Sequence, residues 1–338
     1  RVLITVGYLL AMIFGLFFAY FGHNWAFHGV YIAGLSLIFF AGVLLVIALW
    51  PWNKEYYQPD PAYARTKKGV DVERVAFFAT ALTTILSALF GAVPGSFFGN
   101  GFVVFLAENV IRLPHKSTMQ YAIIGHLHIM LALICIMLTL IIGRWLNFRG
   151  ILHKIAMPLM ILGTIVLNLG VWGVATPLEP IAHMIIYVGA TPSMLAALLL
   201  LIWEWDQLIR TGTAHIEKPK FGQKLRALLR DPLRFGPLWQ MLFMNFTTSF
   251  LGIFMAVRLD EIFRVWPARE ERIELTGHWH VLSAIVATII LLYYGNMIGL
   301  KGKLRQWYGW LIIILSDIAF GAVTVFEMKR LFIDEATQ

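Results

Sequence analysis

Residues 118–142 read TMQYAIIGHLHIMLALICIMLTLII, a stretch without a charged side chain. It is long enough to cross the roughly 30 Å hydrocarbon core of a bilayer as a helix. Similar stretches recur, and they predict about nine transmembrane helices at roughly 2–22, 29–50, 75–93, 118–142, 151–175, 180–203, 236–258, 280–298 and 307–327. The runs lack the two-residue alternation of membrane strands, so we expect an all-α, polytopic transmembrane helix bundle.

The composition supports the same class of protein. Of the 338 residues, 59% are hydrophobic and only 14% are charged, whereas soluble domains carry about a quarter charged residues. The chain therefore has too few charged residues to form the surface of a water-soluble protein, and we expect it to be embedded in lipid. We predict one transmembrane domain over 1–338, with cytoplasmic loops at 51–74 and 204–235. Within the second loop, 218–237 is expected to form a short amphipathic surface helix.

The basic residues give the orientation. Of the 27 Lys and Arg residues, 19 fall on one side of the predicted membrane. The other side holds the remaining eight, which are Arg112, Lys116, Arg258, Arg264, Arg269, Arg272, Lys329 and Arg330. The positive-inside rule makes the first side cytoplasmic, and with it the N-terminus. We expect a bacterial or archaeal cytoplasmic membrane. The net charge of +8 suits anionic lipid, and no nucleic-acid-binding motif is present, so we expect no nucleic-acid partner.

Two short motifs stand out among the ten histidines. Residues 125–128 read Gly-His-Leu-His and residues 277–280 read Gly-His-Trp-His. The apolar continuations are also alike, with GHLHIMLALICIMLTLIIG at 125–143 and GHWHVLSAIVATIILLYYG at 277–295. We interpret the pair as a weak internal repeat.

The predicted topology places both motifs at a similar depth. Each opens a helix that runs from the outer face inward, so both lie in the outer half of the membrane. His183, at the start of another inward helix, and the outer-side residues His23, His28 and His115 gather there too. An ionisable residue inside a membrane is costly and therefore indicates a functional site.

The spacing within each motif indicates a type of ligand. Residues i and i+2 of a helix point about 200° apart, so two such imidazoles cannot chelate one ion together. Each can instead ligate a planar cofactor on its own side of the helix. Haem iron accepts imidazole and offers an apolar macrocycle, so we predict one or two b-type haems held by His126, His128, His278 and His280. One bis-histidine haem is expected to use one histidine from each motif. The remaining pair would bind a second cofactor with His183, His115 or His28, or else hydrogen-bond to the protein.

Other interpretations of the same residues remain open. Imidazoles from several helices also suit copper or zinc, as in a transporter or an assembly or anchor subunit whose histidines bind metal or relay protons. Asp317 is a carboxylate within a predicted span, and two roles are open for it. One is functional, as a proton relay or a quinol contact, and the other is a hydrogen bond to a neighbouring helix. The segment 94–117, which contains Glu108 and is broken by Gly and Pro, is expected to be re-entrant or to lie on the surface.

The motif helices also resemble a known family. Together with the stretch GHLHIMLALICIMLTLIIGRWLNFRGILHKIAMPLMILGTIVLNLGV at 125–171, they are similar to the haem-bearing helices of haem–copper oxidase and nitric oxide reductase catalytic subunits. In that family an H-x-H helix gives one ligand to each of two haems. The resemblance implies this role for His278 and His280 and the other low-spin ligand for His126 or His128. His183 and Tyr187 resemble the copper-ligand helix, but the family's adjacent His-His pair is absent from this sequence.

The sequence thus predicts a membrane-embedded, b-type haem electron-transfer subunit of a larger oxidoreductase complex. Because the histidines gather on the outer side, we expect it to exchange electrons with an outer-face protein such as a cytochrome c. Quinone is a further expected partner.

Overall fold

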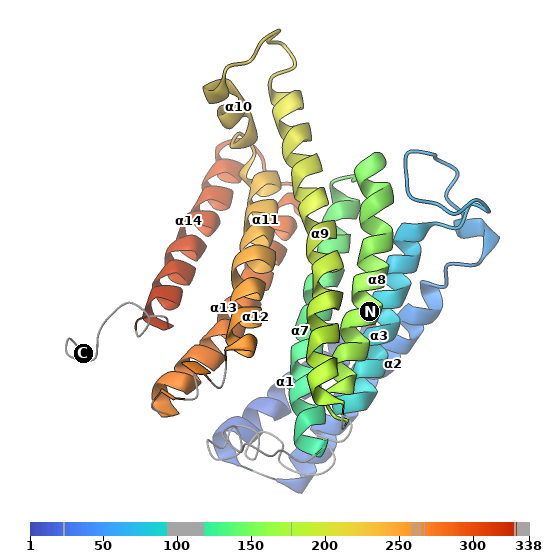
Figure 1. Cartoon of the computed structure of the whole chain (residues 1–338), viewed down its shortest axis with the longest axis vertical. Helices are drawn as coiled ribbons and strands as arrows, with labels where there is room; N and C mark the ends of the chain where they lie inside the picture. Colours follow the sequence, from blue (N-terminus) through green and yellow to red (C-terminus); the bar gives the residue numbers. More distant parts are fainter. Residues whose placement is uncertain are drawn as a thin grey trace. The chain divides into compact units, whose positions relative to one another are not determined.

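A computed structural model describes residues 1–22, 24–92, 118–176, 178–258, 261–262, 265–266, 268–327 and 329. The chain divides into two compact units. Unit 1 comprises residues 1–137 and 157–193, and unit 2 comprises residues 138–156 and 194–338. Figure 1 shows that the described residues form long helices, which confirms the all-α prediction.

Eight helices in the described part of the chain are long and apolar enough to cross a membrane, and a shorter apolar helix precedes them. This agrees with the prediction of about nine spans. All α-helices of the described residues, spanning or not, are α1 (Val2–Phe21), α2 (Trp25–Ala48), α3 (Val72–Ser87), α7 (Thr118–Trp145), α8 (Ile151–Gly173), α9 (Glu179–Gly212), α10 (Phe221–Leu228), α11 (Pro232–Leu242), α12 (Ser249–Val257), α13 (Ala268–Met297) and α14 (Gly302–Glu327). A short 3₁₀ helix, η1 (Lys54–Tyr56), lies between α2 and α3.

Two further elements of the described chain are π-helices rather than α-helices, and residues 261–262 are also π-helical. The first, η2 (Ala88–Ala92), continues α3, and the second, η3 (Phe243–Thr248), joins α11 to α12. In a π-helix the backbone N–H bonds to the carbonyl five residues earlier instead of four, which widens the turn. Each π-helix therefore changes which of the residues that follow it face the neighbouring helices.

Unit 1 begins with a helical hairpin of α1 and α2, which packs beside α3 (Figure 1). The hairpin closes tightly because Gly7 and Gly34 face each other. A Cβ atom added to Gly7 would lie 2.8 Å from the carbonyl oxygen of Gly34. Small residues of this kind let membrane helices approach closely. The chain then turns at residues 51–71, and Asp71 caps α3 by accepting from the N–H of Glu73 at 2.9 Å.

In unit 2, α11, α13 and α14 pack together around an apolar core of Leu233, Phe235, Leu292 and Ile313. Gly236 makes this possible, because a Cβ atom there would lie 2.8 Å from side-chain carbons of both Leu292 and Ile313. The three helices therefore meet at a residue that has no side chain.

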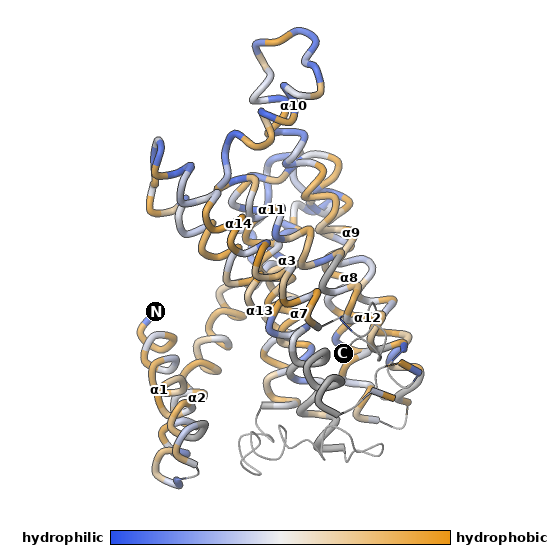
Figure 2. The backbone as a smooth tube through the Cα atoms, turned by 90° about the vertical axis from the view of Figure 1, so that its left-hand side faces the viewer, coloured by the Kyte–Doolittle hydropathy of each residue, from blue (hydrophilic) through white to orange (hydrophobic). Residues whose placement is uncertain are grey.

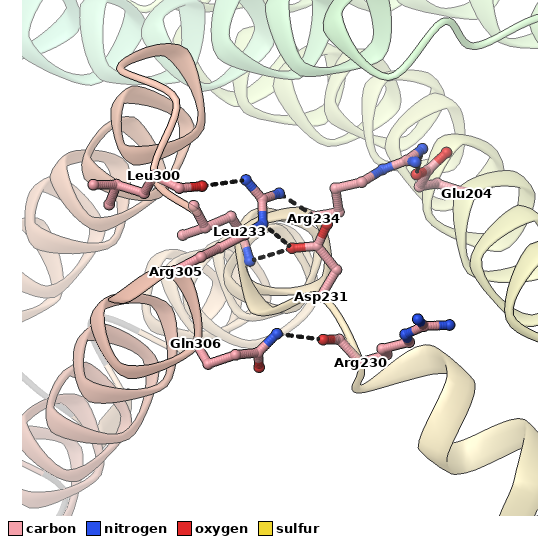
Figure 3. A network of polar contacts seen from close by, with 8 residues as sticks. All are labelled: Glu204, Arg230, Asp231, Leu233, Arg234, Leu300, Arg305 and Gln306. Atoms are coloured by element: carbon pink, nitrogen blue, oxygen red, sulfur yellow. Dashed lines mark hydrogen bonds and ion pairs between the residues drawn. The ribbon is translucent and has the colours of Figure 1, made fainter. Parts of the chain in front are cut away.

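A polar network closes one end of that packing (Figure 3). Asp231 accepts from the N–H of Leu233 at the start of α11 and pairs with Arg305 of α14. Arg234 donates to Glu204 of α9, whose side chain is fully buried. These contacts tie the turn before α11 to α9 and to α14. All of these residues belong to the predicted cytoplasmic side.

Two helices are longer than their predicted spans. The apolar span Gly277–Met297 agrees with the predicted 280–298, but helix α13 begins at Ala268 because the polar run AREERIELTG continues the helix outside its apolar part. The Gly-His-Trp-His motif therefore lies within α13 and not at its start. Similarly, α9 continues to Gly212, so much of the predicted loop 204–235 is helical. Of the predicted surface helix 218–237, the structure has α10 over Phe221–Leu228, in which only Ala227 is buried, whereas residues 232–237 belong to the largely buried helix α11. In Figure 2, hydrophilic colour collects around α10 and its flanking loops.

Candidate functional site

His126, in α7, has one ring nitrogen fixed by a backbone bond. Its Nδ1 lies 3.0 Å from the carbonyl oxygen of Ser87, at the junction of α3 and η2. A carbonyl oxygen can only accept, so Nδ1 must carry the hydrogen. In the neutral ring Nε2 then keeps its lone pair. Metal-binding histidines in proteins typically have this arrangement, with one nitrogen held by a carbonyl and the other left for the metal.

Ser87 is itself held by two side chains of α8. Its hydroxyl donates to Oδ1 of Asn168 at 3.0 Å and accepts from Nε1 of Trp172 at 3.2 Å. Asn168 in turn donates to the carbonyl of Thr164 at 2.6 Å. Ser87, Thr164 and Asn168 are almost completely buried. The carbonyl that orients His126 therefore belongs to a hydrogen-bonded group around a buried serine, which we call the Ser87 cluster (Ser87, His126, Asn168 and Trp172).

A glycine makes room for His126. Gly91 lies in η2, and a Cβ atom added to it would overlap both Cβ and Cγ of His126. No side chain fits at that separation. The π-helix therefore supplies a bare backbone surface against which the root of the His126 side chain packs.

His278, in α13, also packs against a glycine. A Cβ atom added to Gly252 of α12 would lie 2.6 Å from Nε2 and 2.7 Å from Cε1 of His278. Both His126 and His278 are half-buried. The first histidine of each motif thus lies against a glycine of its own unit.

The second histidines are placed differently. His128 and His280 are exposed, and so is His183 in α9. Exposure next to a half-buried first histidine means that the two members of each motif lie on different faces of their helix, as the spacing requires. His126, His128 and His183 lie in unit 1, whereas His278 and His280 lie in unit 2. His28 is half-buried in α2, where its ring lies 5.9 Å from that of Trp25.

Asp317 bonds to α11. Its two carboxylate oxygens accept from Nε1 of Trp239 at 2.9 Å and from Nε2 of Gln240 at 2.8 Å. Of the two interpretations of Asp317, the bond to a neighbouring helix is therefore present in the structure. The single cysteine, Cys135, is buried.

Among the residues that the structure describes, no group of three or more His, Cys, Asp or Glu side chains could hold a metal ion. His23, His115 and the segment 94–117 with Glu108 lie outside the described residues.

The sequence did not predict five residues of these sites, which are Ser87, Asn168, Trp172, Gly91 and Gly252. Asn168 did carry a signal, because it is an amide within the apolar run GTIVLNLGV. The glycines carried none, because their importance depends on which helix lies opposite. Comparisons of the chain with protein-family models, with curated proteins and with solved structures found no match.

Proposed function

We propose that this protein is a membrane cytochrome b, an electron-transfer subunit whose haem iron is held by histidines of the two Gly-His-x-His motifs. The observation that carries the proposal is the bond between Nδ1 of His126 and the carbonyl of Ser87, which leaves Nε2 as the ligand nitrogen. When bound, haem supplies a one-electron redox centre.

The Ser87 cluster supports this role more than a purely structural one. A histidine that only joins two helices needs one hydrogen bond, and any acceptor on the facing helix would serve. Here the acceptor is held by a buried serine, which is held in turn by Asn168 and Trp172. Support of this depth around a ligand's outer nitrogen is typical of metal centres, where it fixes the ring orientation and raises ligand basicity.

The surroundings also suit a large apolar ligand. The helices that carry the histidines have long apolar runs, and in lipid an imidazole nitrogen with a lone pair has few alternative partners. In the predicted orientation both motifs lie toward the outer face. The protein would then exchange electrons with an outer-face redox protein such as a cytochrome c, or with quinone, within a larger complex in a bacterial or archaeal membrane.

The test is a visible spectrum of the purified protein, first oxidised and then reduced with dithionite, together with metal analysis. We expect a sharp α-band on reduction and iron in the preparation. His126→Ala should lose haem, whereas His215→Ala, which changes an exposed histidine in the turn after α9, should retain the wild-type spectrum. Stoichiometric copper or zinc without haem would reject the proposal in favour of a metal-binding transporter or assembly subunit.

A further inference from the structure

Glu204 of α9 is a buried carboxylate that the proposed function does not use. Its side chain is fully buried, and Arg234 of α11 reaches across to donate to Oε1 (Figure 3). The second oxygen, Oε2, is also buried and has no hydrogen-bond partner among the residues that the structure describes. The apolar runs put this residue at the start of the predicted loop 204–235, where water would surround it. Because α9 continues to Gly212, Glu204 lies inside unit 2 instead.

This position suits an ionised carboxylate poorly. Such a group has about four lone-pair positions on its two oxygens, and all of them need donors once water is excluded. A buried ion pair offsets the loss of hydration only when further hydrogen bonds satisfy the remaining lone pairs. Glu204 has one donor, and it leaves Oε2 without a partner. A buried group in this situation becomes neutral, which for a carboxylate means that it binds a proton.

The other charged groups at this end of unit 2 do not supply a second donor. Asp231 has the same charge as Glu204 and acts on it as a like charge. Arg305 of α14 directs two N–H groups to Asp231. Arg230 is exposed, and it is the backbone carbonyl of this residue that joins the network, through a bond from Gln306.

The surroundings along α9 itself are similar. Asp206 and Arg210 pair with each other and are largely exposed. On another flank of α9, Trp203 lies 5.3 Å from the ring of Phe148, which in turn lies 5.3 Å from the ring of the buried His153. Aromatic rings therefore separate that histidine from α9. In the part of the chain that the structure describes, Arg234 is the one counter-ion of Glu204.

The two members of this ion pair differ in their access to water. The side chain of Arg234 is 38% exposed, whereas that of Glu204 is 0% exposed. Water can therefore hydrate the guanidinium when the carboxyl group is neutral, but it cannot hydrate a charged Glu204 in its buried position. A guanidinium stays protonated in proteins, so the carboxylate is the member that changes its charge. Arg234 also connects the pair to solvent on the predicted cytoplasmic side.

We propose that Glu204 is a proton-binding site of unit 2, which takes up one proton from water on the predicted cytoplasmic side when Arg234 turns toward solvent. A hydronium ion gives up its proton, an O–H bond forms on the carboxyl group, and a water molecule remains. The guanidinium of Arg234 loses its charged acceptor and binds water instead. The inference needs no haem, and it goes beyond the proposed function by giving the chain a second activity, reversible proton binding on the predicted inner side.

The experiment records infrared difference spectra of the full-length protein in lipid nanodiscs as the pH is changed, in ordinary and in heavy water. A protonated carboxyl group has a C=O stretching band that an ionised carboxylate lacks, and this band shifts in heavy water. We expect the band near neutral pH, where solvent-exposed carboxylates are ionised. Glu204→Gln should lack it. Asp206→Asn is the matched control on the same helix, because it changes an exposed, paired carboxylate, and it should keep the band.

A second variant gives a result with a defined direction. Arg234→Ala removes the counter-ion of Glu204 and leaves the carboxyl group in place. The pH at which half of the band has formed should rise by about 1–3 pH units, the range for an opposite charge beside a carboxylate. Arg210→Ala, which removes the partner of Asp206, should leave this midpoint unchanged. If thermal melting shows that Glu204→Gln does not fold, the two arginine variants are sufficient for the test.

Three results would overturn the inference. A carboxylate that stays ionised at every pH at which the protein remains folded would mean that Glu204 and Arg234 form a permanent ion pair. A band that persists in Glu204→Gln would belong to another carboxyl group. A midpoint that does not move in Arg234→Ala would mean that the titrating group is not the partner of this arginine. A protein without haem would reject the cytochrome proposal and leave the proton-binding site standing, because the infrared band does not depend on haem.

Discussion

Arg305 and Asp231 form a bidentate ion pair between α14 and the start of α11, with Nε 2.9 Å from Oδ1 and Nη2 2.8 Å from Oδ2. The two side chains are 20% and 30% exposed, so solvent screens the pair only in part. Paired N–H groups of this kind match the planar geometry of a carboxylate, which a lysine cannot do.

The first prediction is that Arg305→Ala lowers the free energy of unfolding by about 1.5–3 kcal/mol, the range for hydrogen bonds to charged groups. Arg305→Lys should lower the free energy of unfolding by less, because lysine keeps the positive charge. Thermal melting in detergent measures both. Arg210→Ala is the control: its pair with Asp206 is 74% and 44% exposed, so its removal should change the melting temperature little. Equal effects at Arg305 and Arg210 would contradict the prediction.

The second prediction concerns Asp317. Asp317→Leu leaves the indole N–H of Trp239 and the amide of Gln240 without their acceptor, which costs roughly 1–3 kcal/mol for each donor. Asp317→Asn retains an acceptor, so its free energy of unfolding should lie between that of Asp317→Leu and that of the wild type. Ile318→Ala, at an exposed neighbouring position, serves as the control in the same melting assay. If Asp317→Leu were as stable as the wild type, the bonds to α11 would not stabilise the helix packing.

The third prediction tests the Ser87 cluster. Ser87→Ala removes the hydroxyl that joins Asn168 to Trp172, and we expect a loss of about 1–3 kcal/mol because buried polar groups lose their partner. The carbonyl that holds His126 is part of the backbone and stays. The variant should therefore keep its haem and melt at a lower temperature. Thr84→Ala, which loses only a bond within α3, should have a smaller effect. Complete loss of haem from Ser87→Ala would contradict the prediction, because it would mean that the carbonyl keeps its position only through the side-chain bonds of the cluster.

The fourth prediction is topological. A reporter fused after residue 338 should be outside the cell, and one inserted near residue 220 should be cytoplasmic. The reason is the excess of Lys and Arg on one side of the predicted membrane and the odd number of spans. Alkaline phosphatase and green fluorescent protein fusions distinguish the two locations. Both reporters on the same side would rule out nine spans.

The apolar runs were sufficient to predict the fold class, because lipid requires helices of about twenty residues and the sequence has little else. They could not locate the ends of α9 and α13. Both helices extend through polar residues beyond their apolar part, α9 at its C-terminal end in WEWDQLIRTG and α13 at its N-terminal end in AREERIELTG. Hydropathy detects the membrane-embedded part of a helix and not the helix itself.

The candidate site could also be predicted only in part. The two histidine pairs stood out because ionisable groups are rare in membrane helices. Their glycine contacts did not, because Gly91 and Gly252 matter only once another helix lies opposite them. The π-helices carry no sequence signature either: ALFGA and FMNFTT read like ordinary helical residues. Those features arise from tertiary packing, which a single sequence does not display.

The π-helix η3 has a consequence for how this chain tolerates change in length. A π segment is equivalent to an α-helix that has accepted one additional residue. Deleting a single residue from 243–248 should therefore restore regular α-helical bonding and leave the residues downstream facing nearly the same direction. Gly252 would then still face His278, whereas a deletion within α12 before Gly252 would turn that glycine away by about 100°, the angle that one residue subtends in an α-helix. The chain should thus tolerate the loss of one residue in η3 but not at the start of α12.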